Sequence, residues 1–409
     1  MTTPRPLSPP PDAGEAMHAL VRSLQPICRS ITGNGVRQTL ARLREHIPLE
    51  IHEVPSGTRV FDWTVPREWN IRDAWVKNAS DASGQRVIDF RRHNLHVVSY
   101  SVPVRARMSL AQLRPHLHSL PDQPDLIPYR TSYYEDNWGF CLPHRQLEAL
   151  PEGEYEVCID STLQDGHLTY GECLIPGASA DEVLVSCHVC HPSLCNDNLS
   201  GIAVATQLAR HLVESGRRLR YSYRFLFVPG TIGSITWLAR NEALTGNIRH
   251  GLVLTCVGDA ASFTYKKSRR GDAEIDQAME HVLRHADAGH RIREFSPYGY
   301  DERQYCSPGF NLPVGCLMRS PHGEFPQYHT SADDLDFVKP EALAGTLATV
   351  MAVCRVLENN RRLLTLNPKC EPQLGRRGLY NSLGGTHIKQ LPSAMLWVMN
   401  LSDGEHSLL

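Results

Sequence analysis

The feature that most constrains the fold of this chain is an alternation of short apolar strands and helical patterns from residue 181 onward. Such alternation is typical of an α/β fold in which a mostly parallel sheet carries helices on both faces. In such sheets, functional sites form beyond the carboxyl ends of the strands. The predicted strands are Glu182–Val189, Tyr223–Val228, Gly251–Val257 and Leu312–Met318, and the predicted helices are Ile202–Leu212, Ile235–Asn241 and Pro340–Leu357.

Residues 59–165 have a different sequence pattern, in which short β-prone stretches such as Val87–Phe90 and Leu95–Ser101 are separated by Pro, Gly, Asn and Asp. The 409 residues exceed the roughly 250–300 that one core usually supports. We therefore predict that 59–165 form a separate β-rich module. The aromatic residues of this module either pack in its core or, around Tyr133–Trp138, form a wall over a neighbouring site.

Charge and hydropathy exclude several classes of protein. With 42 Lys and Arg against 44 Asp and Glu, the net charge is −2, which does not favour nucleic-acid binding. No run of about 18 uncharged apolar residues is present, so we expect no membrane span. The first residues are polar and rich in proline, unlike a signal peptide, so we expect a cytoplasmic protein whose 12 cysteines are reduced thiols.

The segment Cys187–Asn198 concentrates metal-binding side chains at the end of a predicted strand. Its Cys187–His191 portion matches the C-x-x-C-H haem-attachment pattern, which requires export, and buried structural thiols are a further alternative. A metal site fits best, because the strand delivers His188 at its carboxyl end and the loop brings back Asp197 before a helix. Imidazole and carboxylate ligands with one open position suit zinc.

Three segments resemble the zinc aminopeptidases, a superfamily that includes the glutaminyl cyclases. His188-x-Cys190 followed by Asn196–Gly201 resembles their His-x-Asp and Asp-Asn-x-Ser-Gly motifs, and Gly299–Glu302 resembles their Gly-Ser-Asp-His segment. Tyr328–Asp334 resembles their final His-Thr-x-x-Asp motif. The full chain is similar to uncharacterised bacterial aminopeptidase-like proteins with an inserted β-domain and a C-terminal winged helix, and 366–409 resembles a truncated start of that winged helix. This resemblance implies that 59–165 are inserted into a main domain formed by 1–58 and 166–365.

The resemblance implies one Zn²⁺ ion held by His188, Asp197 and His329. We set His191 aside, because strand alternation would put it on the face opposite His188.

The chain departs from the superfamily at its acidic positions. The Glu-Glu pair that supplies the general base and a second-zinc ligand falls at Gly230-Thr231, and Cys190 replaces an Asp. A further Asp ligand falls near Thr255, with Asp259 four residues later. These losses do not favour a second zinc.

A general base is still required, and Glu302 and Glu324 are the candidates, although either could instead be an ion-pair carboxylate. Asp301 and Arg303 are candidates for substrate binding, with a pair between Arg303 and Glu302 as the alternative for the arginine.

The sequence thus predicts a single-zinc hydrolase of the aminopeptidase type that cleaves a peptide or amide bond in a small substrate. A single-zinc acyl transferase or cyclase is one alternative, and a non-catalytic binding protein on the same fold is another. Self-association into a homo-oligomer is compatible with the sequence.

Overall fold

The computed structural model describes residues 9–378 and 390–409. Residues through Val353 form one compact unit and residues from Cys354 onward form another. Residues 379–389 of the predicted winged helix, and residues 1–8 of the N-terminal segment, lie outside the described residues.

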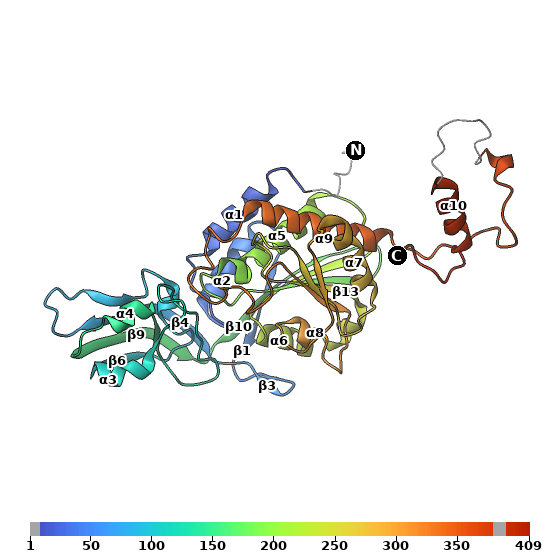
Figure 1. Cartoon of the computed structure of the whole chain (residues 1–409). Helices are drawn as coiled ribbons and strands as arrows, with labels where there is room; N and C mark the ends of the chain where they lie inside the picture. The colour runs from blue at the N-terminus through green and yellow to red at the C-terminus, as the bar shows by residue number, and fades with distance from the viewer. Residues whose placement is uncertain (1–8, 379–389) are drawn as a thin grey trace. The chain divides into compact units, whose positions relative to one another are not determined.

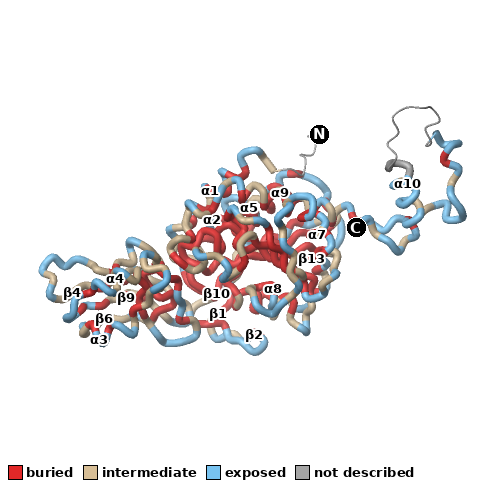
Figure 2. The backbone as a smooth tube through the Cα atoms, viewed as in Figure 1, coloured by how far each residue is buried: buried red, intermediate tan, exposed pale blue. Residues whose placement is uncertain are grey.

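The first unit is built around an eight-stranded mixed sheet. Its central strands β12, β11, β13 and β16 run parallel to one another, and β1, β10 and β14 add antiparallel neighbours. Figure 2 shows that the buried backbone is concentrated on these central strands. The strand order is β1 (Glu50–Pro55), β10 (His167–Ile175), β12 (Ser222–Val228), β11 (Glu182–His188), β13 (Ile248–Leu254), β16 (Val314–Met318), β14 (Thr264–Lys266) and β15 (Arg291–Arg293).

Helices cover both faces of this sheet (Figure 1). Two consecutive residues of β10 point to opposite faces of the sheet, and each meets a helix. Gly171 lies against Leu40 of α2, whereas Glu172 accepts a hydrogen bond from Trp237 of α6. The predicted α/β fold class is confirmed. The helices of this unit include α1 (Ala13–Leu24), α2 (Asn34–Arg44), α5 (Gly201–Glu214), α6 (Ile232–Arg240), α7 (Glu274–Ala286), α8 (Glu302–Tyr305) and α9 (Pro340–Asn359).

Between β1 and β10 the chain forms a second, antiparallel sheet of four strands. This sheet has an apolar core of its own, which includes Val76, Phe140 and Tyr155. It falls within the predicted insertion 59–165. Its strands are β5 (Arg86–Asp89), β4 (Glu68–Asn78), β9 (Glu154–Gln164) and β6 (Val104–Ser109), and the same region holds β2 (Arg59–Val60), β3 (Trp63–Thr64), β7 (Leu117–His118), β8 (Phe140–Cys141), α3 (Leu110–Leu113) and α4 (His144–Glu148).

The β-prone stretch Leu95–Ser101 does not form a strand of the sheet, although Val97 and Ser99 make isolated bridges. Residues Asn94–His96 form a single 3₁₀ turn, in which the imidazole of His93 accepts a hydrogen bond from the backbone of Leu95. This local side-chain contact competes with strand pairing. Apolar residues such as Leu95 are buried there without belonging to a sheet.

Helix α9 is long and apolar enough to cross a membrane by length and composition, with a mean hydropathy of 1.3 over its best window. More than half of that window, 56%, is buried inside the protein. Leu343 and Leu347 are fully buried, and Pro340 packs on Gly14 of α1. These contacts are those of a core helix of an α/β unit.

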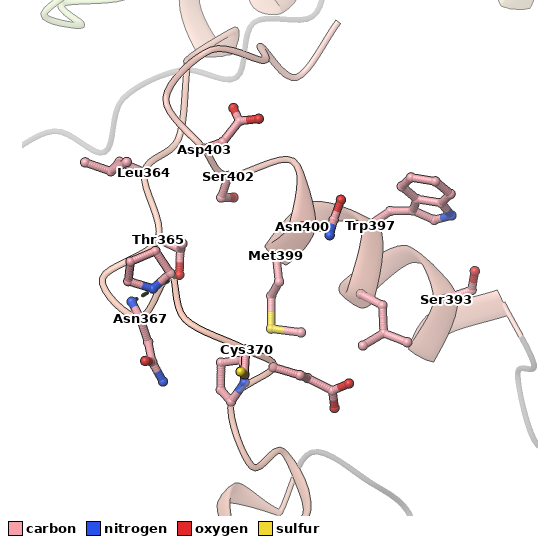
Figure 3. A pocket seen from close by; sticks show the side chains of 14 residues that line it. Leu364, Thr365, Asn367, Cys370, Ser393, Trp397, Met399, Asn400, Ser402 and Asp403 are labelled. Atoms are coloured by element: carbon pink, nitrogen blue, oxygen red, sulfur yellow. Dashed lines mark hydrogen bonds between the residues drawn. The ribbon is translucent and has the colours of Figure 1, made fainter.

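The second unit contains the end of α9, the 3₁₀ turn η5 (Gly375–Arg377) and α10 (Gln390–Asn400). Leu364 pairs with Asp403 in an isolated bridge, and the side chain of Asn360 accepts hydrogen bonds from the backbone of Leu408 and Leu409. Figure 3 shows an open pocket beside α10, into which Met399 and Cys370 project. None of the predicted zinc ligands lies in this unit.

Candidate metal centre

The candidate metal centre lies at the carboxyl end of β11, in the middle of the parallel strands. His188 is the last residue of β11, and Asp197 lies in the turn η3 (Cys195–Ser200) that leads into α5. His329 lies in the loop that follows β16, and its φ angle of 54° is left-handed. The site therefore forms where the alternation of strands and helices predicted it.

The Asp197 carboxylate lies between two imidazoles. Its Oδ1 is 3.0 Å from His188 Nε2, and its Oδ2 is 3.0 Å from His329 Nε2. His188 and Asp197 are buried, whereas the His329 side chain is 33% exposed. The structure thus brings together the three side chains that the sequence singled out as ligands, with one side open to solvent.

His191, which was not predicted as a ligand, belongs to the same cluster. Its Nε2 lies 3.8 Å from Asp197 Oδ2, and its ring centroid is 4.7 Å from that of His188. The expectation that His191 faces away is wrong because β11 ends at His188, so the two-residue alternation of a strand does not extend to residue 191. The turn-forming Pro192 was the signal that the strand had ended.

The donor atoms of His188, His191 and Asp197 all lie within 4.8 Å of one another. Burial lowers the pKa of His191 well below its usual range, which keeps this imidazole neutral. Burial opposes ionisation of Asp197, but the imidazoles of His191, His188 and His329 outweigh it and hold the pKa of this carboxyl well below its usual range. A neutral imidazole and an ionised carboxylate are the forms that ligate metals, so the donor set fits zinc.

Backbone contacts hold Asp197 in place. The backbone N–H groups of Asn196 and Asp197 donate to the Asp333 carboxylate at 2.5 and 2.9 Å. The Asn198 amide donates to Leu254 O at 2.9 Å and lies 3.4 Å from His188 Nδ1. The loop that carries His329 is therefore tied to the turn that carries Asp197.

The inserted region contributes two tyrosines to the wall of the centre. The Tyr129 ring lies 5.0 Å from the His191 ring and 5.1 Å from the His329 ring, and its backbone N–H donates to His329 O. Its hydroxyl is 2.9 Å from that of Tyr133. Trp138, by contrast, stacks on His116 inside the insertion. The ring beside the imidazoles is thus that of Tyr129, four residues before the predicted segment Tyr133–Trp138, and Tyr133 is linked to it through the hydroxyl contact.

Glu302 and Glu324, the predicted bases, are both held in ion pairs. Glu302 is fully buried, lies 2.5 Å from Lys266 Nζ and accepts hydrogen bonds from the backbone of Tyr300. Glu324 forms a two-pronged pair with Arg293 on the surface, at 2.5 and 2.7 Å. The ion-pair alternative considered for both carboxylates is what the structure shows.

Asp301, unlike these two glutamates, has one carboxylate oxygen without a partner. Ser234 donates to its Oδ1 at 2.7 Å, while its Oδ2 is buried without a hydrogen-bond partner. Burial raises the pKa of this carboxyl to about 6, and the nearby His188 opposes that rise. Arg303, the other candidate for substrate binding, is exposed, and its expected pairing with Glu302 is wrong because Lys266 takes that place.

Tyr300 fills the place that the Glu-Glu pair would need. A Cβ atom added to Gly230 would lie 1.9 Å from Tyr300 Cε1. The Tyr300 hydroxyl donates to Gly230 O at 3.1 Å, and its ring lies 4.2 Å from the His188 ring. Burial raises the pKa of Tyr300 well above its usual range, so it is a neutral phenol. Asp259 does not replace the missing carboxylate, because Asn196 and Ser320 donate to its oxygens.

This fold and this cluster define an aminopeptidase-like α/β protein. Residues 18–360 match a family model described as a domain of unknown function, DUF4910, and residues 361–409 match one described as a winged helix-turn-helix. The chain belongs to the DUF4910 family, and the predicted recognition is confirmed.

Three similar proteins share this fold. A Clostridium acetobutylicum protein named "Putative polysaccharide biosynthesis protein with aminopeptidase-like domain" is 55% identical over 97% of this chain and 91% of its own. A crystal structure of a putative peptidase from the same organism has a TM-score of 0.90 at 53% identity, covering 97% of this chain and 90% of that one. A zinc aminopeptidase from Bacillus subtilis shares the fold alone, with a TM-score of 0.60 at 13% identity over 83% of this chain and 93% of that one.

Proposed function

We propose that this chain is a zinc-dependent hydrolase of the aminopeptidase type, which cleaves a peptide or amide bond in a small substrate. The observation that supports this proposal is the Asp197 carboxylate placed 3.0 Å from each of the His188 and His329 imidazoles, with His191 beside them. When bound there, zinc would polarise the substrate carbonyl and acidify a water molecule.

Proton transfer is assigned to Asp301 in this proposal, in place of Glu302 and Glu324. Amide hydrolysis needs a group that removes a proton from the attacking water and returns it to the leaving amine. Asp301 has an unpartnered Oδ2 and a pKa of about 6, close to the pH at which such a base operates. The two glutamates are neutralised by Lys266 and Arg293.

The substrate class follows from the walls of the centre and from the relative's name. Tyr129 and Tyr133 supply aromatic surface and hydroxyl groups next to the imidazoles. Because the Clostridium relative is named for polysaccharide biosynthesis, we include amide-bearing sugars among the proposed substrates, beside short peptides.

The alternative of a non-catalytic binding protein is favoured by one specific observation. Tyr300 occupies the space next to Gly230 where the Glu-Glu pair stands in typical zinc aminopeptidases. An acyl transferase or cyclase would use the same donors, so the substrate panel must include peptides with an N-terminal glutamine.

The test begins with the metal content of the purified chain, followed by assays on aminoacyl anilides, N-terminal glutaminyl peptides and N-acetylated hexosamines. We expect zinc in the protein and a hydrolytic activity that a chelator removes. His329→Ala should lower that activity by more than the roughly 10–100-fold typical of an outer-shell change. The matched control is the exposed His46, since His46→Ala should leave the activity unchanged. Protein that binds no transition metal would refute the catalytic proposals.

A further inference from the structure

Two further donor side chains reach Asp197, neither of which has a role in the site described above. Cys256 Sγ and a ring nitrogen of His322 lie, together with an Asp197 oxygen, within 4.8 Å of one another. Cys256 is fully buried, and it follows β13, which runs parallel to β11. Because parallel strands end at the same edge of the sheet, Cys256 is delivered to the edge that also carries His188.

We propose that Asp197, Cys256 and His322 form a second cation position, which shares Asp197 with the position lined by His188, His191 and His329. It would take a divalent transition ion such as Zn²⁺ or Co²⁺. This inference rests on the proposed function only through the shared Asp197.

The backbone at Cys256 points to a functional role. Its φ angle of 50° is left-handed, a conformation that residues with a side chain rarely adopt. His329, one of the predicted ligands, has the same kind of backbone, with a φ angle of 54°. Cys256 is held there from both sides, since its carbonyl accepts from Arg319 N and the next backbone N–H donates to Ser200. Residues held in such conformations cluster at functional sites.

His322 is held beside Cys256 by a neighbouring hydroxyl group. Its Nε2 lies 3.2 Å from Thr255 Oγ1, the residue that precedes Cys256. Thr255 falls near the superfamily's lost Asp ligand, so the donor expected there is supplied one residue later, as a thiol.

The chemistry of the three donors selects the ion. Thiolate and imidazole ligands favour zinc and cobalt over magnesium and calcium, which prefer all-oxygen sites. Binding would convert the buried thiol to a thiolate. Asp197 then lies between two divalent ions, and Cys256 adds a second negative charge at the second position.

The test uses the full chain, freed of metal by a chelator and reloaded with Co²⁺. A cobalt ion bound to a thiolate gives a sulfur-to-metal charge-transfer band in the near ultraviolet. We expect two cobalt ions per chain and this band. Cys256→Ser should lose the band and bind one cobalt ion. Cys316→Ser removes another buried thiol, from β16, and should keep both ions and the band.

His322→Gln provides a second variant, which should weaken the second ion while the first stays bound. One cobalt ion in the unmodified chain would overturn the inference and leave the proposed function standing, as would a band that survives in Cys256→Ser. No cobalt at all would overturn both.

Discussion

At the scale of single residues, the buried carboxyl of Asp301 should serve as the base of the reaction and at the same time destabilise the folded chain. Its pKa rises from the usual 3.8 to about 6 in the folded chain. A group whose folded pKa is raised binds its proton more tightly when folded, so stability is lost as the pH rises from about 3.8 to about 6. Above that window the loss is constant. The shift of about 2 units corresponds to an upper bound of about 3 kcal/mol.

Asp301→Asn should therefore stabilise the metal-free chain at pH 7 by up to about 3 kcal/mol and have little effect near pH 4. Urea unfolding at the two pH values measures this difference. Ser234, the hydrogen-bond partner of Asp301, supplies the control, because Ser234→Ala removes a donor to the carboxylate without removing the charge. An equal effect of Asp301→Asn at both pH values would contradict the assignment of a raised pKa.

The raised pKa of Asp301 also predicts how the activity depends on pH. A base must be deprotonated, so the rate should rise with pH through a pKa at or below about 6, since a bound cation would add to the effect of His188. Asp301→Asn should abolish this acidic limb and lower kcat by on the order of 100-fold or more. A variant that keeps the limb would show that the proton goes elsewhere.

Gly230 is a second position at which a single side chain should change the stability of the chain. With any larger residue, the Cβ atom would lie 1.9 Å from the Tyr300 ring, so Gly230→Ala should destabilise the chain by roughly 1–3 kcal/mol, as overpacking does. Gly246→Ala is the control, since nothing lies within 4 Å of a Cβ there. In a double-mutant cycle, Tyr300→Ala should relieve part of the effect of Gly230→Ala. Additive effects of the two substitutions would contradict the contact.

At the scale of elements, strands and helices could be predicted well from apolar periodicity, and their ends could not. His188, Asp197 and His329 could be proposed as ligands because a strand end, a helix start and a motif marked them. His191 was missed because the two-residue alternation of a strand was applied to residues beyond the end of β11. The partners of Glu302 and Glu324 could not be predicted, because Lys266 and Arg293 lie 36 and 31 positions away in sequence.

The contact between the His329 loop and the turn η3 is itself testable. Asp333 accepts backbone hydrogen bonds from Asn196 and Asp197 on its two oxygens. In Asp333→Asn one oxygen becomes an NH₂ donor that faces an N–H group, so Asp197 should lose its orientation. We expect zinc affinity to fall about 10–100-fold, as for other outer-shell changes. Titration against a competing chelator measures it, and Asp334→Asn, which alters only the adjacent carboxyl, should have no effect.

At the scale of the whole molecule, zinc should stabilise one unit and leave the other unchanged. The proposed donors come from positions 188 to 329, all within the unit that ends at Val353. An ion that binds only the folded state adds about 4 kcal/mol when it is present at 1,000 times its Kd. Removing zinc with a chelator should therefore lower the Tm of the first unit by several degrees.

The second unit provides an internal control for this measurement, because none of the proposed donors lies within residues 354–409. Calorimetry of the full chain should show one transition that depends on zinc and one that does not. In His188→Ala the zinc-dependent shift of the first transition should become smaller, because one of the imidazoles that flank Asp197 is gone. A zinc-dependent shift of both transitions would mean that the ion acts outside the cluster around Asp197, and the assignment of the centre would then be wrong.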